Sequence, residues 1–350
     1  MKVSIGTKIK DGPWGGGNLF AVNLKSYLLN NGHEVVHDLN DNDLDIILIT
    51  EPRKTSESSG FTHIQVEDYL RFQNSNALVV HRINECDERK GTKYVNKYLI
   101  EANKIADQTI FVSKWLKDLY TRQGMNQLRN TVILAGADQR IFNNDNKSIW
   151  EENQKIKLIT HHWGANKNKG FDVYKKIDNL MSTEKWKDKI EFTYIGNLPA
   201  KFKFQNAVHI PPLSGEKLAK EIKKNHIYIT ASINEPSGNH HIEGSQCGLP
   251  VMFVESGGVT EYCEDYGTSY TLQTLESKLN YVMENYNNLL SKISLYPYNS
   301  DKMAEEFLDL FKNMLKEKDT ILNSRSLSQN STLQNIMYRL KKSLLKFLKY

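Results

Sequence analysis

The sequence predicts an α/β protein made of two similar halves. Short apolar runs recur along the 350 residues, and most of them are followed by a stretch with the apolar spacing of a helix. Such runs, separated by helices, indicate a parallel sheet that is covered on both faces. A polar stretch at 143–154 divides the chain, and the length allows two domains with separate cores. We therefore expect one domain over 1–150 and a second over 151–299.

The first half alternates strands and helices from its beginning. An apolar run at 3–5 predicts the first strand, and the glycine loop 12–17 leads from it into a helix. This helix is predicted over 18–31 because its pattern is amphipathic and Gly32 closes it. Further apolar runs predict strands at 34–37, 45–49, 77–80, 108–112 and 132–134, with helices at 94–106 and 114–123.

The second half repeats this alternation. Its apolar runs predict strands at 157–160, 191–195, 226–232 and 251–254. Amphipathic patterns predict helices at 172–181 and 215–224 between these strands, and at 275–290 and 302–316 after them. Ligands of open α/β sheets bind at the carboxyl ends of the parallel strands, so we look for a site in the segments that follow these strands.

Composition excludes several classes of protein. The net charge is +5, but 323–350 holds six basic residues and no acid, so the rest carries 40 basic and 41 acidic residues. Such a nearly neutral body argues against a nucleic-acid binder. No apolar stretch is long enough to span a bilayer, and the first residues lead directly into a strand pattern rather than a signal peptide. Three cysteines without metal or disulfide spacing indicate reduced thiols in a cytoplasmic protein.

The most informative segment is 235–258. Glu235 and Glu243 are separated by seven residues, after a buried strand and around the start of a helix. The amides at a helix N-terminus favour an anion such as a diphosphate, and a carboxylate early in the helix can accept both hydroxyls of a ribose. A second apolar run then ends on Gly257 and Gly258, where the backbone can approach phosphates closely. The alternative is two solvated glutamates around a short helix.

This segment resembles the E-x7-E signature of retaining glycosyltransferases with the GT-B fold, family 4 in particular. The resemblance covers about residues 1–320. It implies two Rossmann-like domains facing a cleft, with 300–320 crossing back onto the first domain. It also implies metal-independent transfer of a sugar, of the hexosyltransferase type, from a nucleotide diphosphate sugar with retention. Glu243 would hold the ribose and Glu235 the donor sugar. The surrounding donor-binding residues would be Ser237, Gly238, Asn239, Gly257 and Gly258.

The glycine loop near the N-terminus matches neither the dinucleotide fingerprint nor a P-loop. In the resembling family a glycine loop at this place faces the donor diphosphate and the acceptor, so Gly16 and Gly17 are predicted donor contacts. Trp14 could stack on an acceptor sugar, although a Trp beside a cleft also serves packing. The alternative for the loop is a tight turn.

A polar cluster, 81–91, follows the strand at 77–80. In the resembling family a histidine at the end of this strand contacts the donor sugar near the reaction centre, and His81 matches that position. Arg82, Asn84 and Asp87 are candidates for acceptor contacts. The alternative for His81 is a hydrogen-bonded structural histidine.

The segment 160–173 follows the first strand of the second half. There the resembling family places an arginine and then a lysine followed by glycine, which hold the diphosphate. Lys169 matches the lysine and is predicted to act in catalysis, because the departing diphosphate gains negative charge. Trp163 stands near the arginine position, so Asn166, Lys167 or His162 would substitute for it.

Two histidine pairs, His161–His162 and His240–His241, raise the question of a metal. Neither a carboxylate nor a cysteine joins them at ligand spacing, so we expect no metal site and no required cofactor.

The C-terminal segment 321–350 is expected to form a flexible tether and then a basic amphipathic helix over 331–350. Such a helix suits an anionic membrane surface, and equally suits docking on the protein itself or on a partner. The expected partners are therefore a nucleotide sugar donor, a glycan or lipid-linked acceptor and an anionic membrane surface, with the protein cytoplasmic or peripheral at the inner face of the membrane.

Two other functions remain open at this stage. A sugar-nucleotide epimerase or hydrolase with the GT-B fold would consume the donor without an acceptor. A non-catalytic, membrane-associated binding module would depend on 323–350, whereas an enzyme would keep its turnover on a soluble acceptor without that segment.

Overall fold

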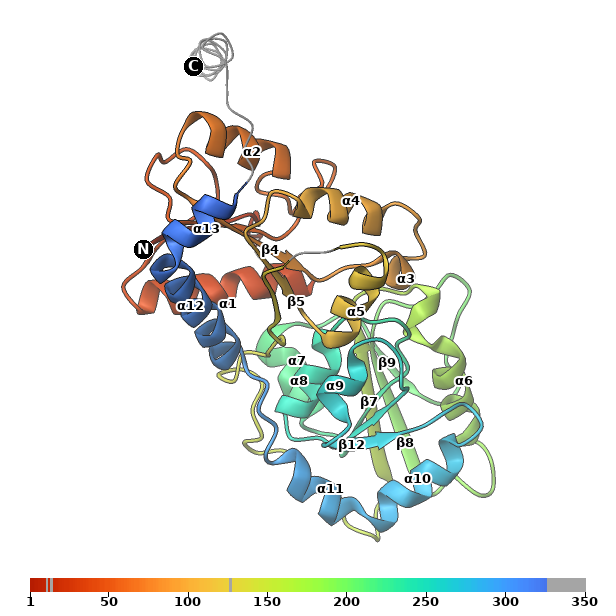
Figure 1. The fold of residues 1–350 in the computed structure, drawn as a ribbon. Coiled ribbons are helices and arrows are strands. Elements are labelled where there is room, and N and C mark those ends of the chain that lie inside the picture. Colours follow the sequence, from red (N-terminus) through yellow and green to blue (C-terminus); the bar gives the residue numbers. More distant parts are fainter. Residues whose placement is uncertain (11, 13–14, 126–127, 326–350) are drawn as a thin grey trace.

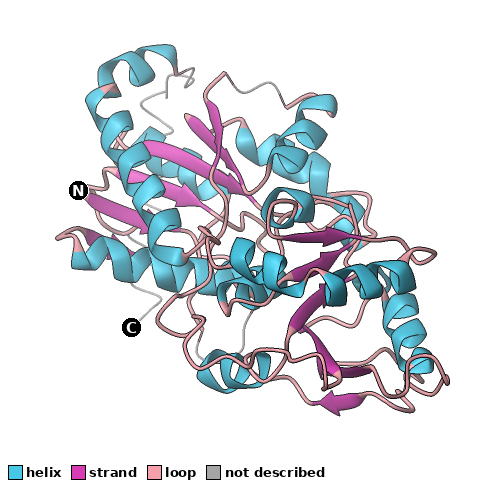
Figure 2. Ribbon diagram, turned by 90° about the horizontal axis from the view of Figure 1, so that it is seen from below, coloured by secondary structure: helices cyan, strands magenta, loops and turns pink. Residues whose placement is uncertain are grey.

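The computed structural model describes residues 1–325, apart from 11, 13–14 and 126–127. The described chain forms two parallel six-stranded sheets with helices between the strands (Figure 1 and Figure 2). The predicted α/β class and the two-part arrangement are confirmed. Trp14 and the predicted amphipathic helix over 331–350 lie outside the described residues.

The first sheet has the strand order β2-β1-β3-β4-β5-β6. Its strands are β1 (Lys2–Ile5), β2 (Glu34–Val36), β3 (Ile46–Ile49), β4 (Leu78–Ile83), β5 (Gln108–Phe111) and β6 (Asn130–Val132). Its helices are α1 (Gly16–Asn30), α2 (His63–Phe72), α3 (Asp87–Lys90), α4 (Val95–Asn103) and α5 (Lys114–Arg122). The order reverses next to β1, so the carboxyl ends of β1, β3 and β4 lie side by side, where open α/β sheets bind ligands.

The second sheet has the order β12-β11-β10-β7-β8-β9. Its strands are β7 (Ile156–His162), β8 (Ile190–Gly196), β9 (Val208–Ile210), β10 (Ile227–Thr230), β11 (Val251–Phe253) and β12 (Gly267–Ser269). Its helices are α6 (Phe171–Leu180), α7 (Gly215–Ile222), α8 (Asn239–Gln246), α9 (Val259–Cys263), α10 (Leu275–Glu284) and α11 (Tyr286–Ile293), with a short 3₁₀ turn η1 (Lys167–Lys169). The chain closes with α12 (Ser300–Lys316) and α13 (Lys318–Ser324).

Some elements differ from the sequence prediction. Helix α2 was not predicted, because it buries few side chains and its start is fixed by a capping box between Thr62 and Gln65 rather than by an apolar stripe. Strands β9 and β12 are three residues long and lack an apolar run. The predicted helix 275–290 is two helices that meet at Asn285, and the strand predicted at 132–134 lies at Asn130–Val132.

Helix α12 belongs to the core of the first domain although it follows the second domain in the sequence. It lies alongside α1 (Figure 1), and the rings of Phe20 and Phe307 are 5.1 Å apart. The return passes close to Gly136, where a Cβ would lie 2.0 Å from the carbonyl oxygen of Asn299. The crossing therefore needs glycine at that position. Beyond α12, Arg325 donates hydrogen bonds to the carbonyl oxygens of Ser75 and Ala77 at 2.8 Å. Residues 321–325, which we expected to belong to a flexible tether, therefore lie in α13 and in this anchor.

The two domains also meet at the N-terminus of α5. Both carboxylate oxygens of Glu261 accept backbone hydrogen bonds, from Lys114 and Trp115, at 2.7 Å each. The adjacent hydroxyl of Tyr262 donates to the carbonyl of Val112 at 2.7 Å. A carboxylate satisfies the unpaired amides at a helix start and interacts favourably with the helix dipole, so the second domain caps a helix of the first.

Within the described residues, each helix is too short or too polar to cross a bilayer.

A Phe307→Ala substitution tests whether α12 is integral to the first domain. The ring is 1% exposed and packs on Phe20 and Phe311. We expect a loss of about 3–5 kcal/mol in the free energy of unfolding, measured with urea. Glu305→Ala, on the exposed face of the same helix, serves as the control and should change stability by less than about 0.5 kcal/mol. Equal stability of the two variants would contradict this packing role.

Candidate functional site

A cavity of about 380 Å³ lies between the two domains. Its wall on the side of the first domain includes the start of α1 and Arg89. Its wall on the side of the second domain includes the end of β7, the start of α8 and both predicted glutamates, Glu235 and Glu243. The site predicted from segment 235–258 is therefore concave, and both domains build it.

Glu235 lies at the centre of this site. Its carboxylate accepts a hydrogen bond from Nζ of Lys169 at 2.6 Å and another from Nε of Arg89 at 2.7 Å. The side chain is 5% exposed. Burial alone would raise the pKa of Glu235, but the charges of Lys169 and Arg89 outweigh it and hold the pKa at about 2. Glu235 is therefore ionised at neutral pH.

Arg89 comes from α3 of the first domain, whereas Glu235 and Lys169 belong to the second. Next to this ion pair, Nδ2 of Asn168 donates to the carbonyl oxygens of Glu88 and Arg89 at 3.0 and 2.8 Å. Sequence reasoning did not single out Arg89 as a site residue. The sequence analysis looked for a second cation near Trp163, and that residue is exposed. The guanidinium next to Lys169 is instead that of Arg89, which lies 146 positions before Glu235 in the sequence. Its place in the polar cluster 81–91 was the available signal.

Glu243 lies on α8 and lines the same cavity. Its Oε2 atom is 2.8 Å from Nε2 of His161, and Nδ1 of that histidine is 3.1 Å from the hydroxyl of Tyr228. The residue is 5% exposed. His161 therefore holds one carboxylate oxygen of Glu243, and Tyr228 holds His161 in turn. These two buried side chains set the orientation of Glu243 toward the cavity.

Three further histidines are buried beside these residues. The rings of His162 and His240 are 4.5 Å apart, and both residues line the first cavity. Burial lowers the pKa of both, so they are neutral at pH 7. His241 is fully buried and neither of its ring nitrogens has a hydrogen-bond partner. The described residues contain no group of three or more histidine, cysteine or acidic side chains arranged to hold a metal.

The other predicted donor contacts fall into three places. Gly16, Gly238 and Asn239 line the first cavity and also a second cavity beside it. A Cβ on Gly16 would lie 2.7 Å from Oδ1 of Asn239, so the two domains approach each other closely here. Asn166 lines the first cavity only, whereas Lys167 is exposed and lines neither.

Gly257 and Gly258 lie behind the site and not on its surface. A Cβ on Gly257 would be 2.4 Å from the carbonyl oxygen of Glu235, and the amide of Gly258 donates to that oxygen at 2.8 Å. Neither glycine lines the two cavities. Their lack of a side chain thus allows the Glu235 loop to pack, which differs from the direct phosphate approach that we expected.

The second cavity has a volume of about 370 Å³ and is lined mainly by the first domain. Of the predicted acceptor residues, Arg82 and Asn84 line it, as do the predicted donor residues Gly17 and Ser237. Asp87 does not. Its carboxylate instead accepts backbone hydrogen bonds from Val95 and Asn96 at 3.0 Å each, and so caps α4.

His81 lies inside the first domain. It is 0% exposed, lines neither cavity, and its Nδ1 atom is 2.9 Å from Oδ1 of Asn103. Successive side chains of a strand point to opposite faces, so in β4 it is Arg82 that faces α1 and the cleft. This geometry matches the alternative of a hydrogen-bonded structural histidine, and it does not support a contact between His81 and the donor.

Comparison with known proteins shows the fold. No protein-family model and no curated protein matches the sequence. HepE from Anabaena, solved with UDP and glucose, aligns with a TM-score of 0.65 at 13% identity over 89% of this chain and 100% of that one. A glycosyltransferase from Rickettsia africae gives 0.64 at 15% identity over 90% and 98%. A sucrose-phosphate synthase from Thermosynechococcus elongatus gives 0.60 at 13% over 90% and 98%. The chain has the two-domain GT-B fold of these proteins, as the sequence predicted.

The ion pair at Glu235 can be tested with Lys169→Met. This change removes one of the two cations next to a buried carboxylate, so the pKa of Glu235 should rise toward its ordinary range. We expect the free energy of unfolding in urea at pH 7 to fall by about 2 kcal/mol or more. The double variant Lys169→Met, Glu235→Gln removes the charge as well and should recover part of the loss. A single variant as stable as the unmodified protein would contradict the pairing.

The buried histidines predict a stability that depends on pH. Burial lowers the pKa of His81 to about 4 and that of His241 to about 3. The unfolded chain therefore binds more protons than the folded protein once the pH is below about 6.5. The stability that these two histidines contribute is complete above that pH and is lost as the pH falls toward 4 and 3. The slope should reach up to about 1.4 kcal/mol per pH unit for each histidine.

Urea unfolding between about pH 8 and pH 5 measures this slope. Glu235 contributes outside this window, because a carboxylate with a lowered pKa loses its stabilising effect only below its ordinary pKa of 4.5. A His81→Gln variant should show a shallower slope than the unmodified protein. An unchanged stability across the window would contradict the burial of both histidines in neutral form.

Proposed function

We propose that this protein is a glycosyltransferase that moves a sugar from a nucleoside diphosphate sugar to a glycan or a lipid-linked acceptor, with retention and without a metal. The observation that carries the proposal is the position of Glu235. It is held by Lys169 and Arg89 where the first cavity meets the second. One cavity then takes the donor and the other the acceptor, with the reacting sugar between them.

The first cavity suits the donor. Glu243 on α8 faces it with an oriented carboxylate, and a carboxylate accepts the paired hydroxyls of a ribose. Lys169, the amides at the start of α8 and Arg89 offer positive charge for a diphosphate. HepE, which shares the fold, was solved with UDP-glucose, so UDP-sugars are the first donors to test.

In the proposed reaction the acceptor oxygen forms a bond to the anomeric carbon on the face from which the diphosphate departs. The bond between that carbon and the phosphate oxygen breaks, and the acceptor proton passes to the departing diphosphate. The diphosphate gains negative charge during this step, so the two cations next to Glu235 stabilise it. The protein would act mainly by orienting the reactants and balancing charge.

A hydrolase or epimerase with the same fold would use the first cavity alone. Arg89 and Glu235 also line the second cavity, and this feature favours an acceptor substrate over water. A binding module that depends on 323–350 draws no support from the described residues.

Thermal denaturation with a panel of nucleoside diphosphates and their sugars, without added metal, tests the proposed function. Binding at about 100 times the Kd stabilises the folded state by about 2.7 kcal/mol. We therefore expect a clear rise in Tm for one base. The absence of any rise across the panel, with a folded protein, would refute the donor site.

The role of Glu243 can be tested with Glu243→Ala, measured by calorimetric titration with the stabilising nucleotide. Loss of a charged hydrogen bond to the ribose should raise the Kd about tenfold to a hundredfold. Glu284→Ala on the exposed face of α10 is the control, because this residue lines neither cavity. An unchanged Kd in Glu243→Ala would remove the ribose role.

A further inference from the structure

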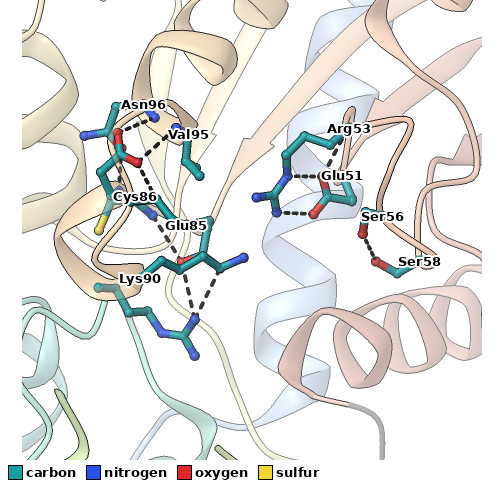
Figure 3. A network of polar contacts seen from close by, with 12 residues as sticks. Glu51, Arg53, Ser56, Ser58, Glu85, Cys86, Lys90, Val95 and Asn96 are labelled. Carbon is teal, nitrogen blue, oxygen red and sulfur yellow. Dashed lines mark hydrogen bonds and ion pairs between the residues drawn. The ribbon is translucent and has the colours of Figure 1, made fainter. Parts of the chain in front are cut away.

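The second cavity carries an excess of positive charge. Its lining includes six basic side chains and three carboxylates. Most of these charges are already paired. Nε of Arg53 donates to Glu51 at 2.7 Å, and Nζ of Lys90 lies 2.9 Å from Glu85. Figure 3 shows the Glu51–Arg53 pair in one place and Glu85 with Lys90 in another. In both of these pairs the charge of the cation is balanced by a neighbouring carboxylate of the protein.

Arg82 differs from these cations because it is buried without a counter-ion. The side chain is 5% exposed, and its Nη1 atom has no hydrogen-bond partner. No ion pair joins Arg82 to a carboxylate among the described residues. The guanidinium lies 3.8 Å above the ring of Phe20, which fixes its plane. Burial lowers the pKa of Arg82 to about 10, so the group still carries its charge at neutral pH.

An unpaired buried charge is unfavourable in the free protein. Leaving a charged donor without a partner costs more than leaving a neutral one, and the cost disappears when an anion supplies the acceptor atoms. A guanidinium is suited to this role because its fork of N–H groups matches the two oxygens of a carboxylate or phosphate.

The start of α1 lies on the same cavity. Gly15, Gly16 and Gly17 line it. The helix is 15 residues long, has no side-chain cap at Gly15 and has no acidic residue in its first turn. Its first amides therefore lack a side-chain partner and add a second source of positive potential near Arg82.

We propose that the second cavity selects an acceptor that carries a phosphate or a carboxylate group, and that Arg82 is the counter-ion for this group. This inference rests on the proposed function, because the cavity is an acceptor site only if the first cavity holds the donor. Asn84 and the hydroxyls of Ser56 and Ser58, 3.0 Å apart, line the cavity. They provide neutral hydrogen-bonding groups for the sugar part of the acceptor.

The first experiment titrates inorganic phosphate into the protein with and without saturating UDP, and follows Tm. UDP occupies the first cavity, so the remaining response reports on the second. We expect Arg82→Met to raise the apparent Kd for phosphate about tenfold or more, and Arg82→Lys to recover part of this loss. Arg53→Met is the matched control, because its guanidinium lies in the same cavity but is paired with Glu51. It should keep the phosphate response.

Two results would overturn the proposal. One is an Arg82→Met variant with the phosphate affinity of the unmodified protein. The other is an equal loss in Arg53→Met, which would mean that phosphate senses only the general charge of the cavity.

The second experiment separates free phosphate from a charged sugar. Glucose, glucuronic acid and glucose 6-phosphate are compared as ligands in the presence of UDP. We expect the two charged sugars to bind at least about tenfold more tightly than glucose, and this preference to vanish in Arg82→Met. If glucose binds as tightly as its two charged derivatives, the proposed preference of the second cavity for an anionic acceptor is refuted.

The Tm response to UDP alone distinguishes the two proposals. A response to UDP together with a phosphate affinity that does not depend on Arg82 would leave the glycosyltransferase proposal intact and refute the anionic acceptor. The absence of a response to UDP and to every other nucleotide of the panel, with phosphate binding that still depends on Arg82, would refute the proposed function and leave the anion site.

Discussion

Glu235 is a buried carboxylate that the two domains hold at the same time. Lys169 of its own domain and Arg89 of the other lie within 2.7 Å of its oxygens, and their charges keep it ionised despite its burial. The two cavities share this carboxylate, so its position sets how they face each other. Two further contacts help to fix the relative position of the two domains. Glu261 caps α5, and α12 returns onto α1.

The two sides of the cleft differ in how they treat charge. In the first cavity Lys169 and Arg89 are balanced by Glu235, and the neighbouring histidines His162 and His240 are kept neutral by burial. In the second cavity Arg82 is buried, and its Nη1 atom has no hydrogen-bond partner among the described residues. A protein tolerates an unpaired buried charge where a ligand completes it, since native structures otherwise satisfy their buried polar groups. The two cavities therefore differ in whether their buried cations are balanced by a carboxylate of the described residues.

The sequence pattern was sufficient for the fold class, and it drew attention to two glutamates that line one cavity. Apolar runs that alternate with amphipathic stretches led to the α/β class, and the spacing of Glu235 and Glu243 marked residues that line one cavity. The pattern was insufficient where an element lacks an apolar run, as in β12, or where a cap rather than a stripe defines it, as in α2. The pattern also could not show which side chains of β4 point toward the cleft. An offset of one residue in the strand decides whether His81 or Arg82 lies on the cleft side.

The sequence by itself determined which local elements form and which loops carry polar groups, because helical and strand periodicity and glycine positions act over short stretches of chain. Only the tertiary structure decided which charges meet. Arg89 and Glu235 are 146 residues apart, and the distance between their side chains depends on two separate sheets and their packing. The same holds for burial. Atoms from distant segments decide whether Gly257 faces a ligand or supports a loop. They also decide whether a guanidinium such as that of Arg82 finds a partner.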